Sequence, residues 1–262
     1  MTRIVAIIQA RMRSSRLPGK MSMDVAGKPL VVRTMERAKA IPSVDAVVLA
    51  TTTCKEDTEL LHLAEEHGII PFAGDEEDVL DRFYHAAVQT KAEAVIRITG
   101  DCPLLDPSVS YQVLTRLLKG TFAYVGNFRP PSFPDGLDTE AFTFEALRHA
   151  WRNATLRSDR EHVTQFISRD SKRSLRANIA NDTDLSGHRW TVDEYEDLEF
   201  VRCVYQGLNR RGWCGHSFQD VLRVVKEDSL RDASSSYIRN EGQIKSFMDD
   251  GLDSAKEIEK LN

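Results

Sequence analysis

The sequence predicts an α/β protein with a doubly wound, mostly parallel sheet flanked by helices. Two observations lead to this prediction. Short, mostly apolar runs rich in β-branched residues alternate with amphipathic stretches of helical spacing over residues 3–118. Polar, Gly- or Pro-containing segments separate the runs, as expected for turns between strands and helices. Ligands bind such sheets at the carboxyl ends of the strands.

The elements follow in order along the chain. Buried strands are expected at the apolar runs, residues 3–9, 45–51, 69–72 and 94–99. Helices are expected where apolar residues recur every three or four positions, at residues 28–40, 58–67, 77–89 and 107–118. After residue 122 the alternation stops, and the Pro-rich segment 129–136 predicts a lid or a substrate rim. Beyond it we expect helices at 142–152 and 159–168, strands at 174–179 and 188–192, a helix to about residue 208, and another at 218–225.

Positive charge is concentrated near the amino end. The 262 residues include 35 Lys and Arg against 40 Asp and Glu, a formal net charge of -5, yet residues 11–20 hold four cations and no acidic residue. Because the chain as a whole is acidic and this cluster is short and lacks aromatic residues, it favours a compact polyanion such as a nucleoside triphosphate over nucleic acid. A solvated basic loop is the alternative.

Two classes of protein are excluded by composition. The longest apolar run near the amino end, Ile4 to Ile8, is too short to span a bilayer, and no secretory signal is expected. The four cysteines are widely spaced, which argues against a disulfide framework or a structural zinc site. We therefore expect a cytoplasmic protein that binds neither membrane nor nucleic acid.

The basic segment and Asp101 each follow an expected strand, so they can face one another across one crevice. Arg and Lys can neutralise a triphosphate, and an aspartate opposite them can hold Mg²⁺ against the same phosphates. Neither a P-loop G-x-x-x-x-G-K-[ST] motif nor a G-x-G-x-x-G fingerprint is present, which argues against P-loop NTPases and dinucleotide dehydrogenases. Taken alone, Asp101 could instead begin a turn, and Asp193 could cap the helix that follows it.

Three segments resemble the cytidylyltransferases that activate sugar acids, the CMP-Kdo and CMP-acylneuraminate synthetases. Residues 10–20 match the pattern A-R-x-x-S-x-R-[IL]-P-x-K at every fixed position. Residues 99–105 resemble the G-D-x-P metal segment, and residues 191–198 resemble the D-x-x-E-D-L segment. Over its whole sequence the chain most resembles the spore-coat polysaccharide biosynthesis protein F group. It departs from the Kdo enzymes at Thr99 and at Cys102, which we expect to be a buried filler.

The resemblance implies a Rossmann-like sheet of the nucleotide-diphospho-sugar transferase type with a smaller α+β insertion. A nucleotidyltransferase domain would cover residues 1–227, with an acceptor-recognition and dimerisation insertion at about 122–190. The polar segment 228–262 would be helical against a partner, or mobile. The implied activity is Mg²⁺-dependent transfer of CMP from CTP to an acidic sugar, with release of pyrophosphate, by a homodimer in surface polysaccharide biosynthesis.

Two other functions remain open at this point. A glycosyltransferase on a related fold would use a nucleotide-sugar donor. Such a donor contains a diphosphate, which needs less positive charge than the basic segment supplies. The third possibility is a nucleotide-sensing or scaffold protein that has lost turnover. The presence of Lys20, Asp101 and Asp193 together argues against such a loss.

The resemblance also implies roles for individual residues. The nucleotide would be bound by Arg11, Ser14, Arg16, Lys20, Thr99 and Gly100. The catalytic residues would be Arg16, Lys20 and Asp101, because the two cations stabilise charge on the α-phosphate and on departing pyrophosphate. Mg²⁺ would be held by Asp101 and Asp193. For the acceptor we expect Asp138, Glu140, Arg160 and His162, with Arg160 as the cation for a sugar carboxylate.

Overall fold

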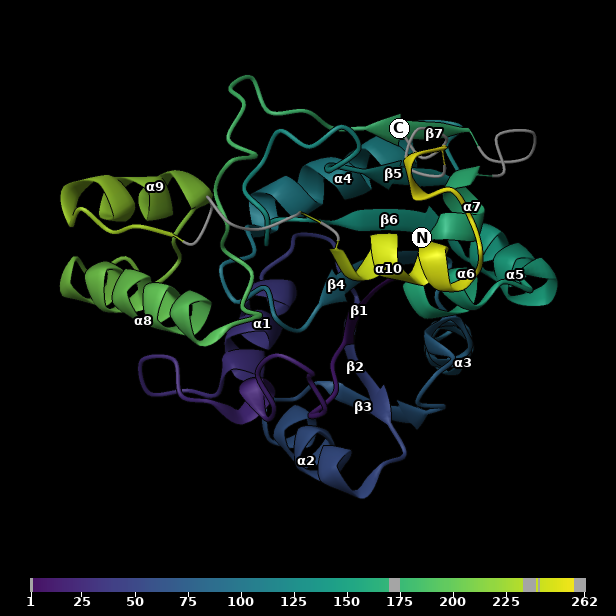
Figure 1. Ribbon diagram of the computed structural model, residues 1–262, viewed down its shortest axis with the longest axis horizontal. Coiled ribbons are helices and arrows are strands. Elements are labelled where there is room, and N and C mark those ends of the chain that lie inside the picture. The colour runs from purple at the N-terminus through teal and green to yellow at the C-terminus, as the bar shows by residue number, and fades with distance from the viewer. Residues whose placement is uncertain (1, 170–174, 233–238, 240, 257–262) are drawn as a thin grey trace.

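A seven-stranded mixed sheet forms the centre of the computed structural model, which describes residues 2–169, 175–232, 239 and 241–256 (Figure 1). The strands are β1 Ile4–Gln9, β2 Ala46–Thr52, β3 Ile70–Gly74, β4 Ala94–Thr99, β5 Tyr124–Gly126, β6 Glu140–Thr143 and β7 Arg176–Asn178. Their order is β3-β2-β1-β4-β6-β5-β7. Only β6 in the described sheet runs antiparallel to its neighbours. The predicted fold class is confirmed.

Helices cover both faces of this sheet. They are α1 Leu30–Lys39, α2 Thr58–Glu66, α3 Val79–Thr90, α4 Pro107–Lys119, α5 Phe144–Asn153, α6 Arg157–His162, α7 Gln165–Arg169, α8 Tyr195–Arg210, α9 Phe218–Glu227 and α10 Glu241–Asp249. Alternate strand residues point to opposite faces, so Ile4, Ala6 and Ile8 join a core with α1, α2, α4, α8 and α9. Val5 and Ile7 join a second core with α3, α5 and α7. None of the helices in the described ranges is long and apolar enough to cross a bilayer.

The predicted elements agree with the structure up to residue 119. Beyond it, the helices expected at 142–152, up to about residue 208 and at 218–225 correspond to α5, α8 and α9, but other predictions differ. Strands β5 and β6 were not predicted, and the expected strand at 188–192 is wrong. Only one isolated bridge forms there, between Arg189 and Asp135, and the Val192 amide donates to the Asp101 carbonyl rather than to a strand. The expected helix 159–168 is divided at Val163, whose φ of 59° cannot continue a right-handed helix. The expected strand 174–179 is β7, and Ser174 lies outside the described residues.

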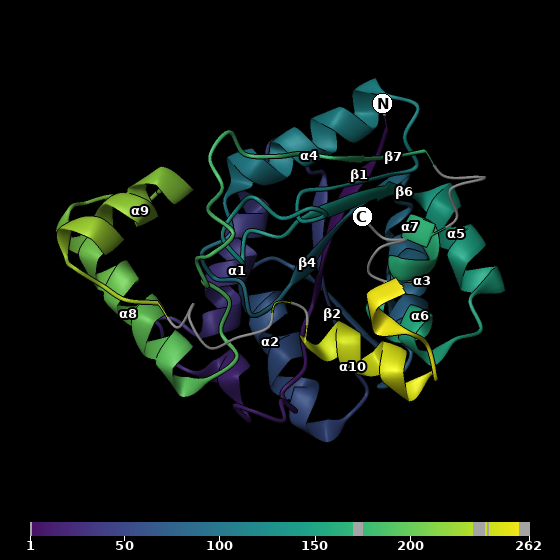
Figure 2. The same ribbon diagram turned by 45° about the horizontal axis from the view of Figure 1, so that its top comes forward.

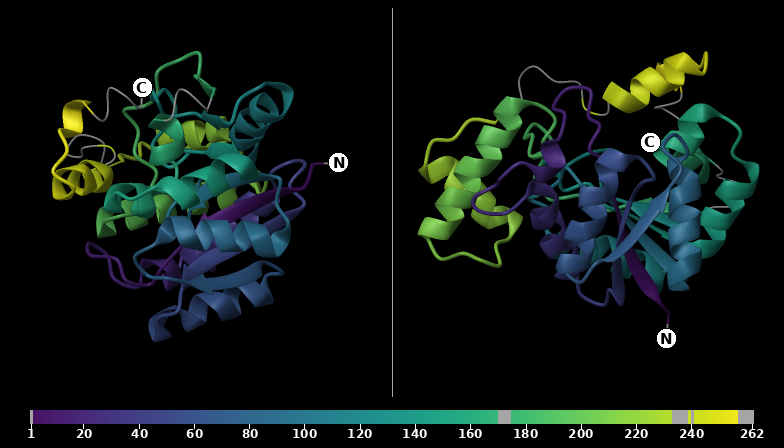
Figure 3. Two further views of the ribbon diagram at one scale, coloured as in Figure 1. Left: turned by 90° about the vertical axis from the view of Figure 1, so that its right-hand side faces the viewer. Right: turned by 90° about the horizontal axis from the view of Figure 1, so that it is seen from below.

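The carboxyl ends of the parallel strands meet at one edge of the sheet. The loop after β1 and the loop after β4 lie there, and α10 lies on the same side of the molecule (Figures 2 and 3). Helix α10 packs on α6 of its own chain, with Phe247 fully buried. The carboxy-terminal segment is therefore helical at 241–249 and contacts its own domain, whereas residues 233–238, 240 and 257–262 lie outside the described residues.

Candidate active site

Lys20 lies between two aspartates that the chain brings from distant segments. Its Nζ donates to Asp101 Oδ2 at 2.8 Å, to Asp193 Oδ1 at 3.0 Å, and to the Val192 carbonyl at 2.7 Å. Only 5% of Lys20 is exposed. Burial lowers the pKa of Lys20, but the two carboxylates outweigh burial and raise that pKa above its ordinary value. Burial raises the pKa of Asp101, but the Lys20 ammonium outweighs burial and holds the pKa of Asp101 below its ordinary value. Lys20 and Asp101 are therefore both charged at neutral pH.

The local backbone explains why these side chains meet. Gly19, at φ 73°, turns the chain so that Lys20 begins a short 3-10 helix below the end of β1. Asp101 directly follows β4, and the Val192 amide donates to its carbonyl at 2.9 Å. The N-cap of α8 is Glu194, in a reciprocal capping box with Asp197. Asp193 is therefore not the cap, and its carboxylate is available to the site.

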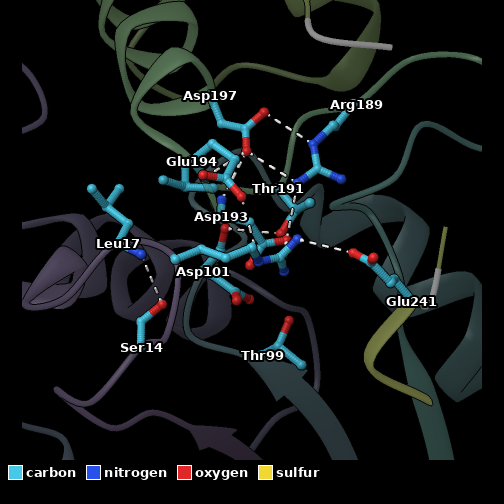
Figure 4. Close-up of polar contacts among 12 residues, drawn as sticks. Ser14, Leu17, Thr99, Asp101, Arg189, Thr191, Asp193, Glu194, Asp197 and Glu241 are labelled. Atoms are coloured by element: carbon cyan, nitrogen blue, oxygen red, sulfur yellow. Dashed lines mark hydrogen bonds and ion pairs between the residues drawn. The ribbon is translucent and has the colours of Figure 1, made fainter. Parts of the chain in front are cut away.

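Two arginines complete the charge around Asp193 (Figure 4). Arg16 Nη2 and Arg189 Nη2 each lie 3.0 Å from Asp193 Oδ2. Arg189 is anchored by Asp197, whereas Arg16 is about one third exposed and also approaches Glu241 at 3.7 Å. One carboxylate, that of Asp193, thus contacts three cations, Lys20, Arg16 and Arg189.

Two adjoining cavities open on either side of this cluster. The first-loop compartment, about 310 Å³, is lined mainly by residues 9–21 and by α3. The insertion compartment, about 260 Å³, is lined mainly by residues 128–140, 189–193 and 241–243. Both compartments share the walls formed by Gln9, Arg16, Thr99, Asp101 and His162. Asp101 thus stands where two bound molecules can meet.

The sequence matches a family profile described as cytidylyltransferase over residues 5–207. The chain belongs to the cytidylyltransferase family. It is 31% identical to spore coat polysaccharide biosynthesis protein SpsF of Bacillus subtilis over 221 residues. This aligned segment covers 80% of this chain and 90% of that protein. It is 40% identical over 107 residues to 3-deoxy-manno-octulosonate cytidylyltransferase of Chloroherpeton thalassium, which covers 40% of this chain and 42% of that protein.

A solved structure supports the same family. The cytidylyltransferase from Leptospira borgpetersenii serovar Hardjo-bovis superposes with a TM-score of 0.83 at 27% identity, over 91% of this chain and all of that one. These comparisons confirm the resemblance predicted from the segments 10–20, 99–105 and 191–198.

In this cytidylyltransferase the residues expected to bind nucleotide gather around the first-loop compartment. Its lining includes Arg11, Ser14, Arg16, Lys20 and Thr99. Gly100 is not among the lining residues; its amide donates to the Gln9 carbonyl at 2.8 Å, and a Cβ there would lie 2.9 Å from the Ala10 Cβ. Arg82, which is 3% exposed, also lines this compartment.

The residues expected to bind the acceptor separate into two groups. Asp138, Glu140 and His162 line the insertion compartment. Arg160 does not line either compartment: its Nε donates to Asp78 at 2.8 Å, and its Nη1 donates to the Trp151 carbonyl at 2.8 Å. Arg160 therefore ties α6 to the N-terminus of α3, and the structure does not bring it to the predicted position.

The carboxylates of the insertion compartment differ in protonation. Burial raises the pKa of Glu140, but Arg97 and Arg129 outweigh burial and lower it. Burial raises the pKa of Asp138, and Arg239 only partly opposes this. Burial, together with the charge on Asp138, raises the pKa of Asp135 to about 7. Glu140 is therefore ionised at neutral pH, whereas Asp135 titrates near neutral pH.

His162 links the compartment wall to the carboxy-terminal helix. Its Nε2 lies 2.9 Å from the Ser246 hydroxyl, which donates to Glu161. Burial lowers the pKa of His162 to about 4, so the imidazole is neutral at physiological pH. The next residue, Val163, is fully buried and has a positive φ, an unusual conformation for a β-branched residue. Strained backbone of this kind is often found next to functional sites.

Sequence reasoning missed several residues of the insertion compartment. Arg97 had a visible signal, since it is the only charged residue in the expected strand 94–99, and it pairs with Glu140. Arg129 and Asp135 lay in the segment interpreted as a rim loop. Glu241 and Gln243 come from α10, which had no predicted place. Cys102 is 4% exposed, as expected for a buried filler, and burial raises its thiol pKa.

Proposed function

We propose that this cytidylyltransferase transfers CMP from CTP to an acidic sugar and releases pyrophosphate, in surface polysaccharide biosynthesis. The convergence of Lys20, Asp101 and Asp193 between two compartments is the observation that carries the proposal. The first-loop compartment would hold CTP, and the insertion compartment would hold the acceptor. The names of two relatives, one in spore-coat polysaccharide synthesis and one acting on an octulosonate, support the acceptor class and the pathway.

In the proposed reaction an acceptor hydroxyl oxygen bonds to the α-phosphorus, the bond to the bridging oxygen breaks, pyrophosphate leaves, and water takes up the hydroxyl proton. Arg11 and Ser14 would hold the nucleotide, and Arg16 would face the phosphates. Lys20 would stabilise the charge that develops on the α-phosphate, since a cation buried in a site of low dielectric acts strongly. Positioning and neutralisation together account for most of the catalysis expected for this kind of transfer.

Mg²⁺ is the cofactor that we propose for this site. Across the described residues no three His, Cys, Asp or Glu side chains are placed to hold a metal. Asp101 and Asp193 fit a magnesium ion nonetheless, because Mg²⁺ commonly uses one or two carboxylates and completes its shell with phosphate and water. Both carboxylates already contact a cation, the Lys20 ammonium. When bound there, Mg²⁺ would neutralise triphosphate charge. A cytoplasmic homodimer remains a proposal that comes from the family resemblance.

The test is pyrophosphate release across CTP, UTP, ATP and GTP with a panel of acidic sugars, with and without Mg²⁺. We expect a preference for CTP, dependence on the metal, and near-total loss in Asp101→Ala. Asp184→Ala is the control, since Asp184 is an exposed loop residue bonded to Ser186. Normal turnover in Asp101→Ala contradicts the assignment of the site. Glycosyl transfer from a nucleotide sugar, without pyrophosphate release, contradicts the reaction.

A further inference from the structure

The arginines that line the insertion compartment are not equivalent. Three of them are paired with carboxylates of the chain: Arg16 with Asp193, Arg97 with Glu140, and Arg189 with Asp197. Arg129 also lines the compartment, but none of the carboxylates in the described residues pairs with it. Its Nη1 is buried and has no hydrogen-bond partner there. The side chain thus brings a positive charge to the cavity that the described protein does not neutralise directly.

Other contacts hold Arg129 in place. Its backbone amide donates to Asn178 Oδ1 at 3.0 Å, which anchors the residue beside β7. Its guanidinium carbon lies 4.8 Å from the centroid of the Phe128 ring, and this ring also lines the compartment. Stacking on an aromatic face positions a guanidinium while leaving the N–H groups at its edge available to a ligand. A buried donor without a partner lowers stability unless a ligand satisfies it.

The remaining charges of the compartment specify what that ligand presents. Arg129 is among the groups that lower the pKa of Glu140 and of His162, so its field extends through the cavity. Asp135 and Asp138 also line the compartment, and their carboxyl groups are suited to hydrogen-bond with hydroxyl groups. A planar carboxylate matches the two-pronged donor edge of a guanidinium. The compartment therefore suits a molecule with a carboxylate at one end and hydroxyls at the other.

We propose that Arg129 binds the carboxylate of the acidic sugar acceptor and selects for it. This inference rests on the proposed function, and it assigns to Arg129 the contact that the sequence predicted for Arg160. Arg129 is then a binding residue of the insertion compartment, and it contributes nothing to CTP affinity.

The test is direct binding at saturating CTP, measured by calorimetry without Mg²⁺ so that no turnover occurs. The probes are N-acetylneuraminate and 3-deoxy-manno-octulosonate, each compared with its methyl ester. We expect the wild-type protein to bind at least one acid at least tenfold more tightly than its ester. Arg129→Gln should abolish that difference, and Arg129→Lys should restore part of it. Arg116→Gln is the matched control, since Arg116 also stacks on a phenylalanine, Phe122, outside both compartments.

CTP affinity measured on the same samples separates the possible results. Unchanged CTP affinity in Arg129→Gln shows that the variant is folded and that its first-loop compartment is intact. The inference is overturned if Arg129→Gln keeps the acid preference, if acid and ester bind the wild type equally, or if none of the probes binds. The proposed function fails separately, when the wild type binds the acid but releases no pyrophosphate.

Discussion

The Lys20 ammonium lies 2.8 Å from the Asp101 carboxylate although 81 residues separate them in the sequence. The same ammonium contacts Asp193, a further 92 residues along the chain, at 3.0 Å. Since Lys20 is almost completely buried, these contacts are part of the fold as well as of the site. Removing the cation leaves two carboxylates facing one another without their shared partner.

Lys20→Met should therefore reduce the free energy of unfolding by about 3 kcal/mol at pH 7, in addition to abolishing turnover. Adding Asp101→Asn to that variant should recover part of the loss, because one unpaired charge is removed. Urea unfolding of the two single variants and the double variant measures this coupling. Lys119→Met, at an exposed position near the end of α4, is the control. Strictly additive effects would falsify the proposed dependence on the shared cation.

Gly136 is a second position where the fold constrains the site. Its φ is 105°, and a Cβ there would lie 2.7 Å from the Thr191 amide nitrogen and from the Trp190 carbonyl carbon. Gly136→Ala should reduce the free energy of unfolding by about 2–4 kcal/mol, since both the conformation and the space oppose a side chain. Gly187→Ala is the matched control, because a Cβ at Gly187 meets nothing within 4 Å. Thermal unfolding of both variants compares them, and equal melting temperatures would contradict the prediction.

The amino-terminal half of the fold could be predicted because local pattern and topology agree there. Mostly apolar runs became β1 to β4, and the strand-end positions of the basic segment and Asp101 brought them together. Beyond residue 120 the strands are short, and β5 has only three residues, so periodicity carries little signal. The interpretation of residues 188–192 failed because their backbone partners are Asp135 and Asp101, both in loops, and no local pattern specifies such contacts.

The acceptor side of the site shows the same limit. Arg160 was chosen for its residue type, but which carboxylate an arginine meets depends on the tertiary structure, and Arg160 meets Asp78. The residue now proposed, Arg129, lies in a Pro-rich segment without secondary-structure signal. Helix α10 lies outside the segment that matches the family, so the motifs gave no information on its place.

The raised pKa of Asp135 predicts a pH-dependent gain of stability on substitution. Its pKa is about 7 in the folded protein, against an ordinary value of 3.8. The folded state therefore holds the proton more tightly, and the contribution of Asp135 to stability is full below about pH 4 and is lost as pH rises through 7. The free energy of unfolding of Asp135→Asn, measured with urea, should exceed that of wild type by about 4 kcal/mol at pH 8 and should match it at pH 4.

Burial is the largest cause of the raised pKa of Asp135. The charged groups that add to it or oppose it are Asp138, Arg239, Arg189 and Asp193. Asp184→Asn controls for a simple change in net charge, since Asp184 lies on the exposed surface. A difference between Asp135→Asn and wild type that stays constant between pH 4 and pH 8 would show that ionisation is not its cause.

Phe247 provides a way to test whether α10 completes the acceptor compartment. Its side chain is fully buried. The adjacent Ser246 hydroxyl is hydrogen-bonded to Glu161 and His162, the last two residues of α6. Because α10 is a short peripheral helix, losing this anchor should release it locally without unfolding the sheet. Phe247→Ala should then raise the KM for the acceptor about tenfold, which corresponds to about 1.4 kcal/mol of binding free energy. The KM for CTP should stay within about twofold of wild type.

Met248→Ala is the matched control, because its side chain is adjacent in the same helix but is 61% exposed. Hydrogen exchange at residues 241–249 should increase in Phe247→Ala and stay unchanged in Met248→Ala. If exchange rises in Phe247→Ala but both KM values stay at wild-type levels, α10 is dispensable for acceptor binding. If the two KM values rise together, α10 supports the whole active site, because the walls shared by the two compartments include Arg16 and His162, both of which contact this helix.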